Sequence, residues 1–208
     1  RAYDPEVQRW VALKIPMPGI LTDASLRQRF VQEAQAAGGL SHPNIVPVFE
    51  AGEDDLLCYL VSELVRGPNL AVWRRDQQSP TSPQAAARLV GELADAVEHA
   101  HSRGVLHRDI KPSNILLEPW EAGDQRGGEA IPYRARLTDF GLAKVTTGVD
   151  LTASGSVLGT VNYMAPEQAR GKVREIGPAS DVYALGAVLY ELLTGQTPLQ
   201  GENHPDTL

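Results

Sequence analysis

Hydrophobic positions along the first third of the chain predict strands with one helix between them. Residues 7–15 carry apolar side chains at alternate positions, which is typical of a half-buried strand. Residues 23–38 change to helical spacing and are followed by glycine, a common helix end. Residues 45–50 and 56–64 are rich in strand formers and are separated by a polar turn, so they predict an antiparallel hairpin.

Hydrophobic positions beyond residue 66 predict mainly helices. Residues 83–103 place apolar side chains on one face of a long amphipathic helix. Residues 182–193 are shorter than the roughly 20 residues that a bilayer crossing needs, so they predict a buried core helix. Residues 115–117 and 136–138 predict a second hairpin, and the long insertion between them is either mobile or functional. Strands followed by helices predict an α+β fold with two lobes.

Composition and charge narrow the classes of function. The formal net charge is -7 and no run of five like charges occurs, so the chain lacks the footprint of nucleic-acid binding or of an anionic membrane surface. Cys58 is the only cysteine, which excludes an internal disulfide and a cysteine-based zinc site and favours the cytoplasm. The five histidines lack metal-ligand spacing. Arg1 in place of methionine predicts that the true N-terminus is absent.

The strongest chemical signal is the sequence HRDIKPSN at residues 107–114, which follows the long predicted helix. It matches HRDxxxxN, the catalytic-loop pattern of protein kinases. The resemblance implies that Asp109 accepts the proton of the substrate hydroxyl, that Lys111 steadies the γ-phosphate, and that Asn114 offers an amide oxygen to magnesium. Taken alone, the motif could also be a polar loop of capping residues.

Two further motifs resemble kinase residues that hold the nucleotide. Asp139 begins the sequence DFG at the end of a strand-like segment, where the resemblance implies that it chelates magnesium. Alone, this sequence could be an ordinary turn after a strand. Lys14 ends the sequence VALK, which resembles the kinase strand whose lysine grips the α- and β-phosphates. Glu33, on the following predicted helix, is the expected ion partner of Lys14.

The later motifs complete the order seen in serine/threonine kinases. The sequence APE at residues 165–167 closes the segment that begins at Asp139, and Thr160 is expected to contact the catalytic loop. Asp181 opens the apolar helix and resembles the buried aspartate that braces the catalytic loop through backbone hydrogen bonds. Glu167 resembles a structural glutamate that pairs with an arginine further along the chain.

With these motifs in order over nearly its whole length, the chain resembles a eukaryotic-like serine/threonine protein kinase of the bacterial kind. The implied fold has a small antiparallel-sheet lobe and a mainly helical large lobe, incomplete at both termini. Residues 1–65 would be the partial small lobe, with the hinge near residues 63–67, and residues 66–208 the partial large lobe. Lysine and proline at positions 111 and 112 favour serine/threonine over tyrosine specificity.

The resemblance also implies the residues that bind ATP, which with Mg2+ is the expected cofactor. Backbone groups of Glu63 and Val65 would bind adenine, and Ala12 and Leu116 would sandwich it. Ser62 would occupy the gatekeeper position. The glycine-rich loop GxGxxG that covers the phosphates in kinases does not precede residue 11, so we expect that truncation has removed it. The isolated fragment is therefore expected to bind ATP poorly and to be inactive.

The chain also ends before the helices that complete the large lobe. The arginine that pairs with Glu167 is therefore expected to be missing, and a buried Glu167 would be costly or have a raised pKa. Arg108 resembles the arginine that pairs with a phosphate in kinases activated by phosphorylation. The candidate phosphorylation sites could equally be polar residues of an exposed loop: Thr152, Ser154 and Thr147, with Thr146 and Ser156 in addition.

Two functions follow from these expectations. The first is transfer of the γ-phosphoryl group of ATP to serine and threonine hydroxyls of protein substrates, in bacterial signalling with autophosphorylation of the activation segment. The second is a non-catalytic binding module, for which the missing glycine-rich loop is the argument. The resemblance also implies a homodimer formed through the small lobe, and a membrane anchor outside these residues. Nucleic acid and membrane contacts are not expected within them.

Overall fold

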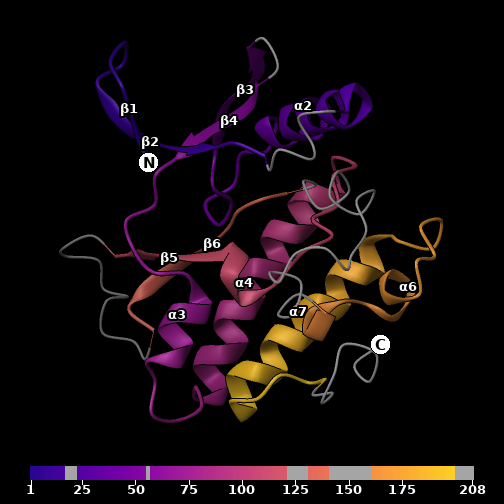
Figure 1. Ribbon diagram of the computed structural model, residues 1–208. Helices are drawn as coiled ribbons and strands as arrows, with labels where there is room; N and C mark the ends of the chain where they lie inside the picture. The colour runs from indigo at the N-terminus through magenta and orange to yellow at the C-terminus, as the bar shows by residue number, and fades with distance from the viewer. Residues whose placement is uncertain (17–22, 55–56, 121–130, 141–160, 200–208) are drawn as a thin grey trace.

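The computed structural model describes residues 1–16, 23–54, 57–120, 131–140 and 161–199, and its first part is an antiparallel sheet accompanied by one helix (Figure 1). The sheet has the strand order β1-β2-β4-β3, and each neighbouring pair is antiparallel. The strands are β1 (Ala2–Asp4), β2 (Arg9–Lys14), β3 (Val48–Asp54) and β4 (Leu57–Glu63). Helix α2 (Ala24–Gly38) packs against β3 and β4.

Helix α2 begins where the sequence supplies a capping side chain. The carboxylate of Asp23 accepts hydrogen bonds from the backbone N–H groups of Ser25, at 2.7 Å, and Leu26, at 3.2 Å. The Ser25 hydroxyl also donates to Asp23, and these bonds hold the pKa of Asp23 below its usual value. From this start, the apolar face of α2 packs against β4 in a small cluster of buried residues: Leu26, Phe30, Ala34, Cys58 and Leu60.

Two of the predicted strands differ from the structure in detail. Of the alternating apolar residues expected in a strand over residues 7–15, only Val11 of β2 is buried, whereas Leu13 of β2 and Ile15, just after it, are exposed, because α2 covers β3 and β4 instead. Strand β3 begins at Val48, later than predicted, and continues through residues 52–54, which were expected to form the turn. The segment before Val48 turns away to pair with the second hairpin.

The helical part of the molecule is built around α4 (Pro83–His101) and α7 (Pro178–Thr194), which pack against each other (Figure 1). The amphipathic face of α4 supplies Leu89, Leu93 and Val97 to the large core. Helix α7 was expected to be a buried core helix, but Val182 and Tyr190 are 60% and 45% exposed. The remaining elements are α3 (Leu70–Arg75), η1 (Pro112–Asn114), β5 (Ile115–Pro119), β6 (Tyr133–Leu137), η4 (Val161–Tyr163) and α6 (Pro166–Ala169).

The sheet and the helical part meet at two chain segments. The Ile45 segment forms a parallel bridge with Leu137 of β6, and the Asn44 side chain donates to the carbonyl of Ala135 at 2.8 Å. After β4, the chain packs so closely on β5 that a Cβ on Gly67 would lie 1.9 Å from the carbonyl oxygen of Leu117. Only glycine fits at that position.

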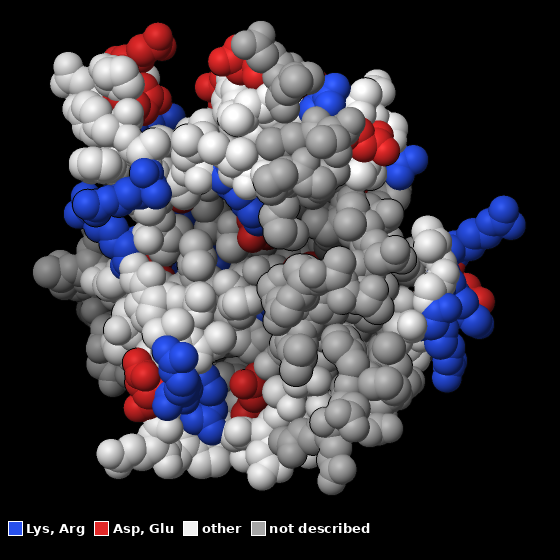
Figure 2. Space-filling view, in the orientation of Figure 1, with Lys and Arg blue, Asp and Glu red and all other residues white. Residues whose placement is uncertain are grey.

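The α+β class and the two-part arrangement predicted from the sequence are confirmed. The sheet with α2 lies at one end and the helices lie at the other, joined near the end of β4 (Figure 1). On the face shown in Figure 2, basic and acidic side chains of the described residues are interspersed. Within the described part of the chain, no helix combines the length and apolar character that a bilayer crossing requires.

Candidate active site

The catalytic-loop motif lies between α4 and η1, where a buried carboxylate holds its backbone. Asp181, in the first turn of α7, is 1% exposed and accepts hydrogen bonds from the N–H groups of His107, at 2.9 Å, and Arg108, at 2.7 Å. The ring Nε2 of His101 lies 2.8 Å from the same carboxylate. Arg108 has a φ of 65°, a left-handed conformation that a non-glycine residue adopts only when its surroundings hold it. Asp181 therefore fixes the strained turn before Asp109.

Asp109 contacts both of the other residues predicted to serve catalysis in this loop, Lys111 and Asn114. The Lys111 ammonium lies 2.8 Å from Oδ2 of Asp109. The Asn114 amide donates to the same oxygen at 3.0 Å and to the backbone carbonyl of Asp109 at 2.8 Å. These bonds fix the rotamer of Asp109, which keeps about a fifth of its side-chain surface exposed. A carboxylate held in this way can accept a proton from a hydroxyl that approaches from solvent.

His107 links the catalytic loop to the Asp139 segment. Its Nε2 lies 3.0 Å from the carbonyl of Thr138, and its Nδ1 accepts a hydrogen bond from the N–H of Asp109. The ring also packs against Phe140, with 4.6 Å between centroids. Burial lowers the pKa of His107, although the carboxylates of Asp181, Asp109 and Asp139 act in the opposite direction. A neutral ring suits both hydrogen bonds, because Nδ1 must accept and Nε2 must donate.

We expect the stability of the protein to fall as the pH is lowered through the range below 6.5. The folded-state pKa of His107 lies below the 6.5 of the unfolded chain, so the unfolded state binds more protons in that interval. The loss is at most about 1.4 kcal/mol per pH unit for one histidine. Urea unfolding about one unit above and about one unit below 6.5 measures it. A His107→Gln variant should show a smaller pH dependence, and an unchanged slope would contradict the assignment.

Lys14 and Asp139 come together from opposite parts of the molecule. The Lys14 ammonium at the end of β2 lies 2.7 Å from Oδ2 of Asp139, with side chains 45% and 26% exposed. Asp139 has a φ of 68°, a second left-handed residue at this site. The backbone N–H of Thr138 donates to the carbonyl oxygen of Asn114 at 3.0 Å, which brings Asp139 beside the catalytic loop. The two predicted carboxylates, the amide and the ammonium therefore share one site.

The predicted ion pair between Lys14 and Glu33 is wrong for this structure. Lys14 pairs with Asp139, and Glu33 of α2 lies 3.3 Å from the guanidinium of Arg108. In both pairs, the cation lies close to a carboxylate from a segment that is distant in sequence. In this structure Arg108 joins α2 to the catalytic loop, and its expected pairing with a phosphate stays a prediction. Sequence order alone does not distinguish these two pairings.

The residues present fit a magnesium ion. Asn114 and Asp139 supply an amide oxygen and a carboxylate, the hard oxygen ligands that Mg2+ prefers. Because the Asn114 amide nitrogen donates to Asp109, its oxygen is left for another partner. Among the residues that the structure describes, no group of three or more His, Cys, Asp or Glu side chains could hold a metal. Magnesium that is bound mainly through phosphate oxygens and water does not need such a group.

The residues expected to bind adenine lie on both sides of the junction between sheet and helices. Ala12 and Ser62 are paired across β2 and β4, and Glu63 ends β4. Val65 follows in the connecting segment, and Leu116 is on β5, where Asn69 forms an isolated bridge with it. Apart from buried Ser62, these side chains are half-buried. Their role in binding adenine stays a prediction.

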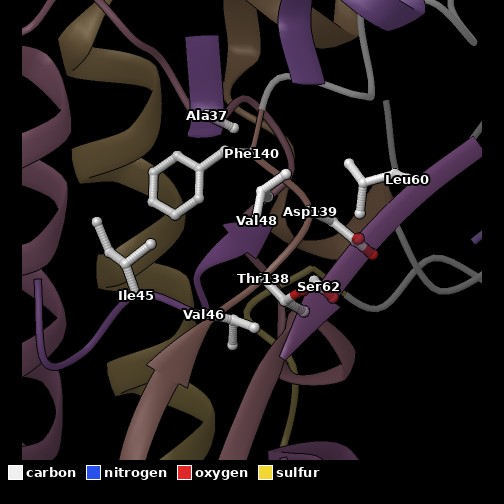
Figure 3. Close-up of a pocket in the computed structure, with 9 residues that line it drawn as sticks. All are labelled: Ala37, Ile45, Val46, Val48, Leu60, Ser62, Thr138, Asp139 and Phe140. Atoms are coloured by element: carbon white, nitrogen blue, oxygen red, sulfur yellow. The ribbon is translucent and has the colours of Figure 1, made fainter. Parts of the chain in front are cut away.

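A small pocket adjoins Ser62 and Asp139 (Figure 3). Its walls are mostly apolar, and polar atoms come from Ser62, Thr138 and Asp139. The sequence analysis did not predict this pocket, because its lining comes from four segments that are distant in sequence. The nine lining residues are Ala37, Ile45, Val46, Val48, Leu60, Ser62, Thr138, Asp139 and Phe140.

The raised pKa expected for a buried Glu167 does not apply, because Glu167 is only half-buried. The Ser180 hydroxyl donates a hydrogen bond to Oε1 of half-buried Glu167, and this bond lowers the pKa of Glu167 below its usual value. Gln168, to which the sequence assigned no role, donates from Nε2 to the carbonyl of Arg108 at 2.8 Å. The only signal for Gln168 was its place after the APE motif.

Several predicted residues lie outside the described part of the chain. They are the structural Thr160 and the candidate phosphorylation sites Thr147, Thr152 and Ser154, together with Thr146 and Ser156. Most of the insertion between β5 and β6, residues 121–130, also lies outside it. These residues stay predictions from the sequence.

The whole chain is similar to proteins of one known family. The family model described as "Protein kinase domain" matches residues 1–208. Serine/threonine-protein kinase PrkC of Bacillus subtilis (strain 168) is 40% identical over 202 residues, covering 97% of this chain and 29% of that protein. Serine/threonine-protein kinase PknJ of Mycobacterium tuberculosis is 39% identical over 197 residues, covering 95% and 31%. The chain thus spans less than a third of these relatives.

Similar folds are found among solved structures. The crystal structure of the Mycobacterium tuberculosis PknI kinase domain matches with a TM-score of 0.71 and 28% sequence identity. The match covers 97% of this chain and 71% of that chain. The likeness therefore extends over both the sheet and the helices.

Proposed function

Because this chain belongs to the protein kinase domain family, and within it resembles the bacterial serine/threonine kinases, we propose that the protein transfers the γ-phosphoryl group of ATP to serine and threonine hydroxyls of protein substrates. One observation carries the proposal. Lys14, the catalytic-loop residues Asp109 and Asn114, and Asp139, which come from three separate segments, meet at one partly exposed site. Phosphoryl transfer needs this combination of cation, base and oxygen ligands, because catalysis depends on positioning and charge.

The proposed mechanism assigns each side chain a task that its contacts support. Asp109 accepts the proton of the substrate hydroxyl, and Asn114 holds its carboxylate in position. Lys111, next to Asp109, stabilises negative charge on the transferred phosphoryl group. Lys14 binds the phosphates of ATP. When bound by Asn114 and Asp139, Mg2+ would neutralise charge on the phosphate oxygens.

Nucleotide binding requires the present ion pairs to exchange partners. Lys14 is paired with Asp139 in this structure, and in kinases the corresponding lysine pairs with a glutamate of the neighbouring helix. Glu33 reaches that state only after leaving Arg108. A phosphate on the activation segment would compete with Glu33 for the Arg108 guanidinium. We therefore include autophosphorylation of that segment in the proposal, with Thr147, Thr152 and Ser154 as candidates.

Replacing Lys14 by methionine tests the proposal in the full-length protein. We expect phosphate incorporation from Mg-ATP into a mixed protein substrate to fall on the order of 100- to 1000-fold, because a preorganised positive partner of the phosphates is lost. Phosphoamino-acid analysis of the wild-type product should give phosphoserine and phosphothreonine. The matched control is Lys172→Met, since Lys172 is an exposed lysine that pairs with Glu175. Equal incorporation by wild type and Lys14→Met would refute the proposal.

The alternative is a module that binds nucleotide without transferring phosphate. The exchanged ion pairs, Lys14 with Asp139 and Glu33 with Arg108, are the observation in its favour. Binding of a fluorescent ATP analogue without any phosphate incorporation by the wild type would support it.

A cytoplasmic location, a role in bacterial signalling and a homodimer through the small lobe are further parts of the main proposal. Sedimentation of the full-length protein would test the homodimer.

A further inference from the structure

Arg136 is a buried arginine whose guanidinium joins four segments of the chain. It belongs to β6 and is 7% exposed. Its two terminal nitrogens donate to both carboxylate oxygens of Glu63, at 2.9 and 3.0 Å. One of them also lies 3.2 Å from the carboxylate of Glu118, and the other donates to the backbone carbonyl of Ile45 at 3.2 Å. A bidentate pair of this kind fixes both distance and orientation.

The pair joins the sheet to the helical part of the molecule. Glu63 is the last residue of β4, and the chain then enters the segment that leads to α3. Arg136 and Glu118 belong to the β5–β6 hairpin. Arg136 therefore anchors the end of the small sheet to a hairpin of the helical part.

Arg136 also lies beside a residue that we propose as one wall of the adenine site. Leu116 and Arg136 are direct partners in the antiparallel register of β5 and β6. Directly opposed residues place their side chains on the same face of a sheet. Glu118, two residues after Leu116, shares that face. The Leu116 side chain, proposed to contact adenine, and the Arg136 side chain, which binds Glu63, therefore lie on the same face of the β5–β6 hairpin.

We propose that Arg136 is a positioning residue that sets the hinge at Glu63 for adenine binding. The inference rests on the proposed function, in which the backbone of Glu63 binds adenine. A backbone hydrogen bond to a planar ligand tolerates little displacement, and the bidentate pair holds Glu63 from its side chain. Without the pair, Glu63 is held only through its backbone, by its N–H bond to the carbonyl of Pro47 at 3.0 Å and its pairing with Val11, and the adenine-binding edge shifts.

Other contacts hold the two parts of the molecule together, so the role of Arg136 is separable from folding. The N–H of Val46 donates to the carbonyl of Leu137, and the N–H of Leu137 donates to the carbonyl of Asn44, both at 2.8 Å. The Asn44 side chain adds its bond to Ala135. These contacts do not involve Glu63. Removing the guanidinium of Arg136 should therefore change the position of Glu63 more than it weakens the contact between the sheet and the helical part.

The test compares Arg136→Gln, Arg136→Lys and wild type in the full-length protein. Steady-state kinetics with Mg-ATP gives kcat and the KM for ATP, and titration with a fluorescent ATP analogue gives Kd without turnover. We expect Arg136→Gln to raise KM and Kd on the order of 10- to 100-fold, the effect of a small displacement in a binding group. The kcat should change by less than about twofold, and Arg136→Lys should recover part of the affinity, since one charge-assisted bond remains.

Two matched variants separate the hinge from general stability. Arg134 is a cation on the same strand that lies 3.7 Å from Glu118 and does not contact Glu63. The Arg134→Gln variant should therefore bind ATP like wild type. Glu63→Gln should reproduce the effect of Arg136→Gln, and it provides the same test if Arg136→Gln does not fold. The double variant should be no weaker than either single one, because both remove the same interaction.

The outcomes distinguish this inference from the proposed function. Unchanged KM and Kd in Arg136→Gln would overturn the role of Arg136, whether or not the melting temperature falls. Equal losses in Arg134→Gln and Arg136→Gln would also overturn it, since the effect would not be specific to the hinge. A wild-type protein that binds no nucleotide analogue would overturn the proposed function, and the inference with it.

Discussion

Replacing Asp109 by asparagine is expected to lower kcat about 100- to 10,000-fold, the contribution of a positioned general base. Asparagine has nearly the same shape as aspartate but cannot accept the substrate proton. The Lys111 ammonium and the Asn114 amide, both within 3.0 Å of Oδ2, hold the side chain of residue 109 in place. We therefore expect the loss in the chemical step, with little change in the KM for ATP.

The measurement is the rate of phosphate transfer from Mg-ATP to a protein substrate by the full-length protein. Asp95→Asn is the matched control, because Asp95 is exposed on α4 and lies outside the site. Binding of a fluorescent ATP analogue by Asp109→Asn should match wild type. A variant that keeps more than about a tenth of the wild-type kcat would show that Asp109 is not the base.

Replacing Asp181 by alanine is expected to lower the free energy of unfolding by about 3–5 kcal/mol, the usual cost of removing one side of a buried charged contact. The N–H groups of His107 and Arg108 and the ring of His101 would lose their common acceptor. Asp181 is 1% exposed, so water cannot readily take its place. The left-handed conformation of Arg108 would also lose its support, and kcat should fall with stability.

Urea unfolding of the full-length protein measures the change in stability, and circular dichroism follows it. His101→Gln is the graded control, because it replaces the ring donor with a side-chain amide and leaves the two backbone donors to Asp181 in place. It should cost about 1 kcal/mol, the value of a single hydrogen bond. If Asp181→Ala were as stable as His101→Gln, the backbone contacts of Asp181 would not support the catalytic loop.

The elements that sequence patterns predicted best are those whose pattern is both long and local. Helix α4 was expected over residues 83–103 and is found at Pro83–His101, because its apolar face repeats over five turns' worth of sequence and a serine cap precedes it. Strand β3 was misplaced, since residues 44–46 leave the sheet to bond with β6. Short strands are decided by such distant partners, which local propensity does not contain.

Exposure was predicted less well than element type. The apolar residues 182–193 indicate a core helix, and α7 is the helix that they form. Its side chains at Val182 and Tyr190 are nevertheless exposed. The hydrophobic content of a segment indicates that its helix can be buried. Which of its residues are buried depends on the elements that pack against each face of the helix. In β2 the same reason leaves Leu13 exposed.

The sequence by itself determined the family, the order of the longer strands and helices, and the chemical types at the candidate site, whereas β1, α3 and α6 were not predicted. Motifs such as HRDIKPSN are local strings, so the types and spacing of their side chains can be read without knowing the fold. Asp181 was also identified from its motif as the support of the catalytic loop, a prediction that agrees with its two backbone hydrogen bonds.

Only the tertiary structure decided which charges are partners. Lys14 meets Asp139, Glu33 meets Arg108, and Arg136 meets Glu63, although several oppositely charged side chains were available to each. An ion pair forms between groups within about 4 Å, and that closeness is created by packing segments that are distant along the chain. The sequence therefore determines which charged side chains are present and how far apart they are along the chain. The packing of distant segments determines which of them form ion pairs.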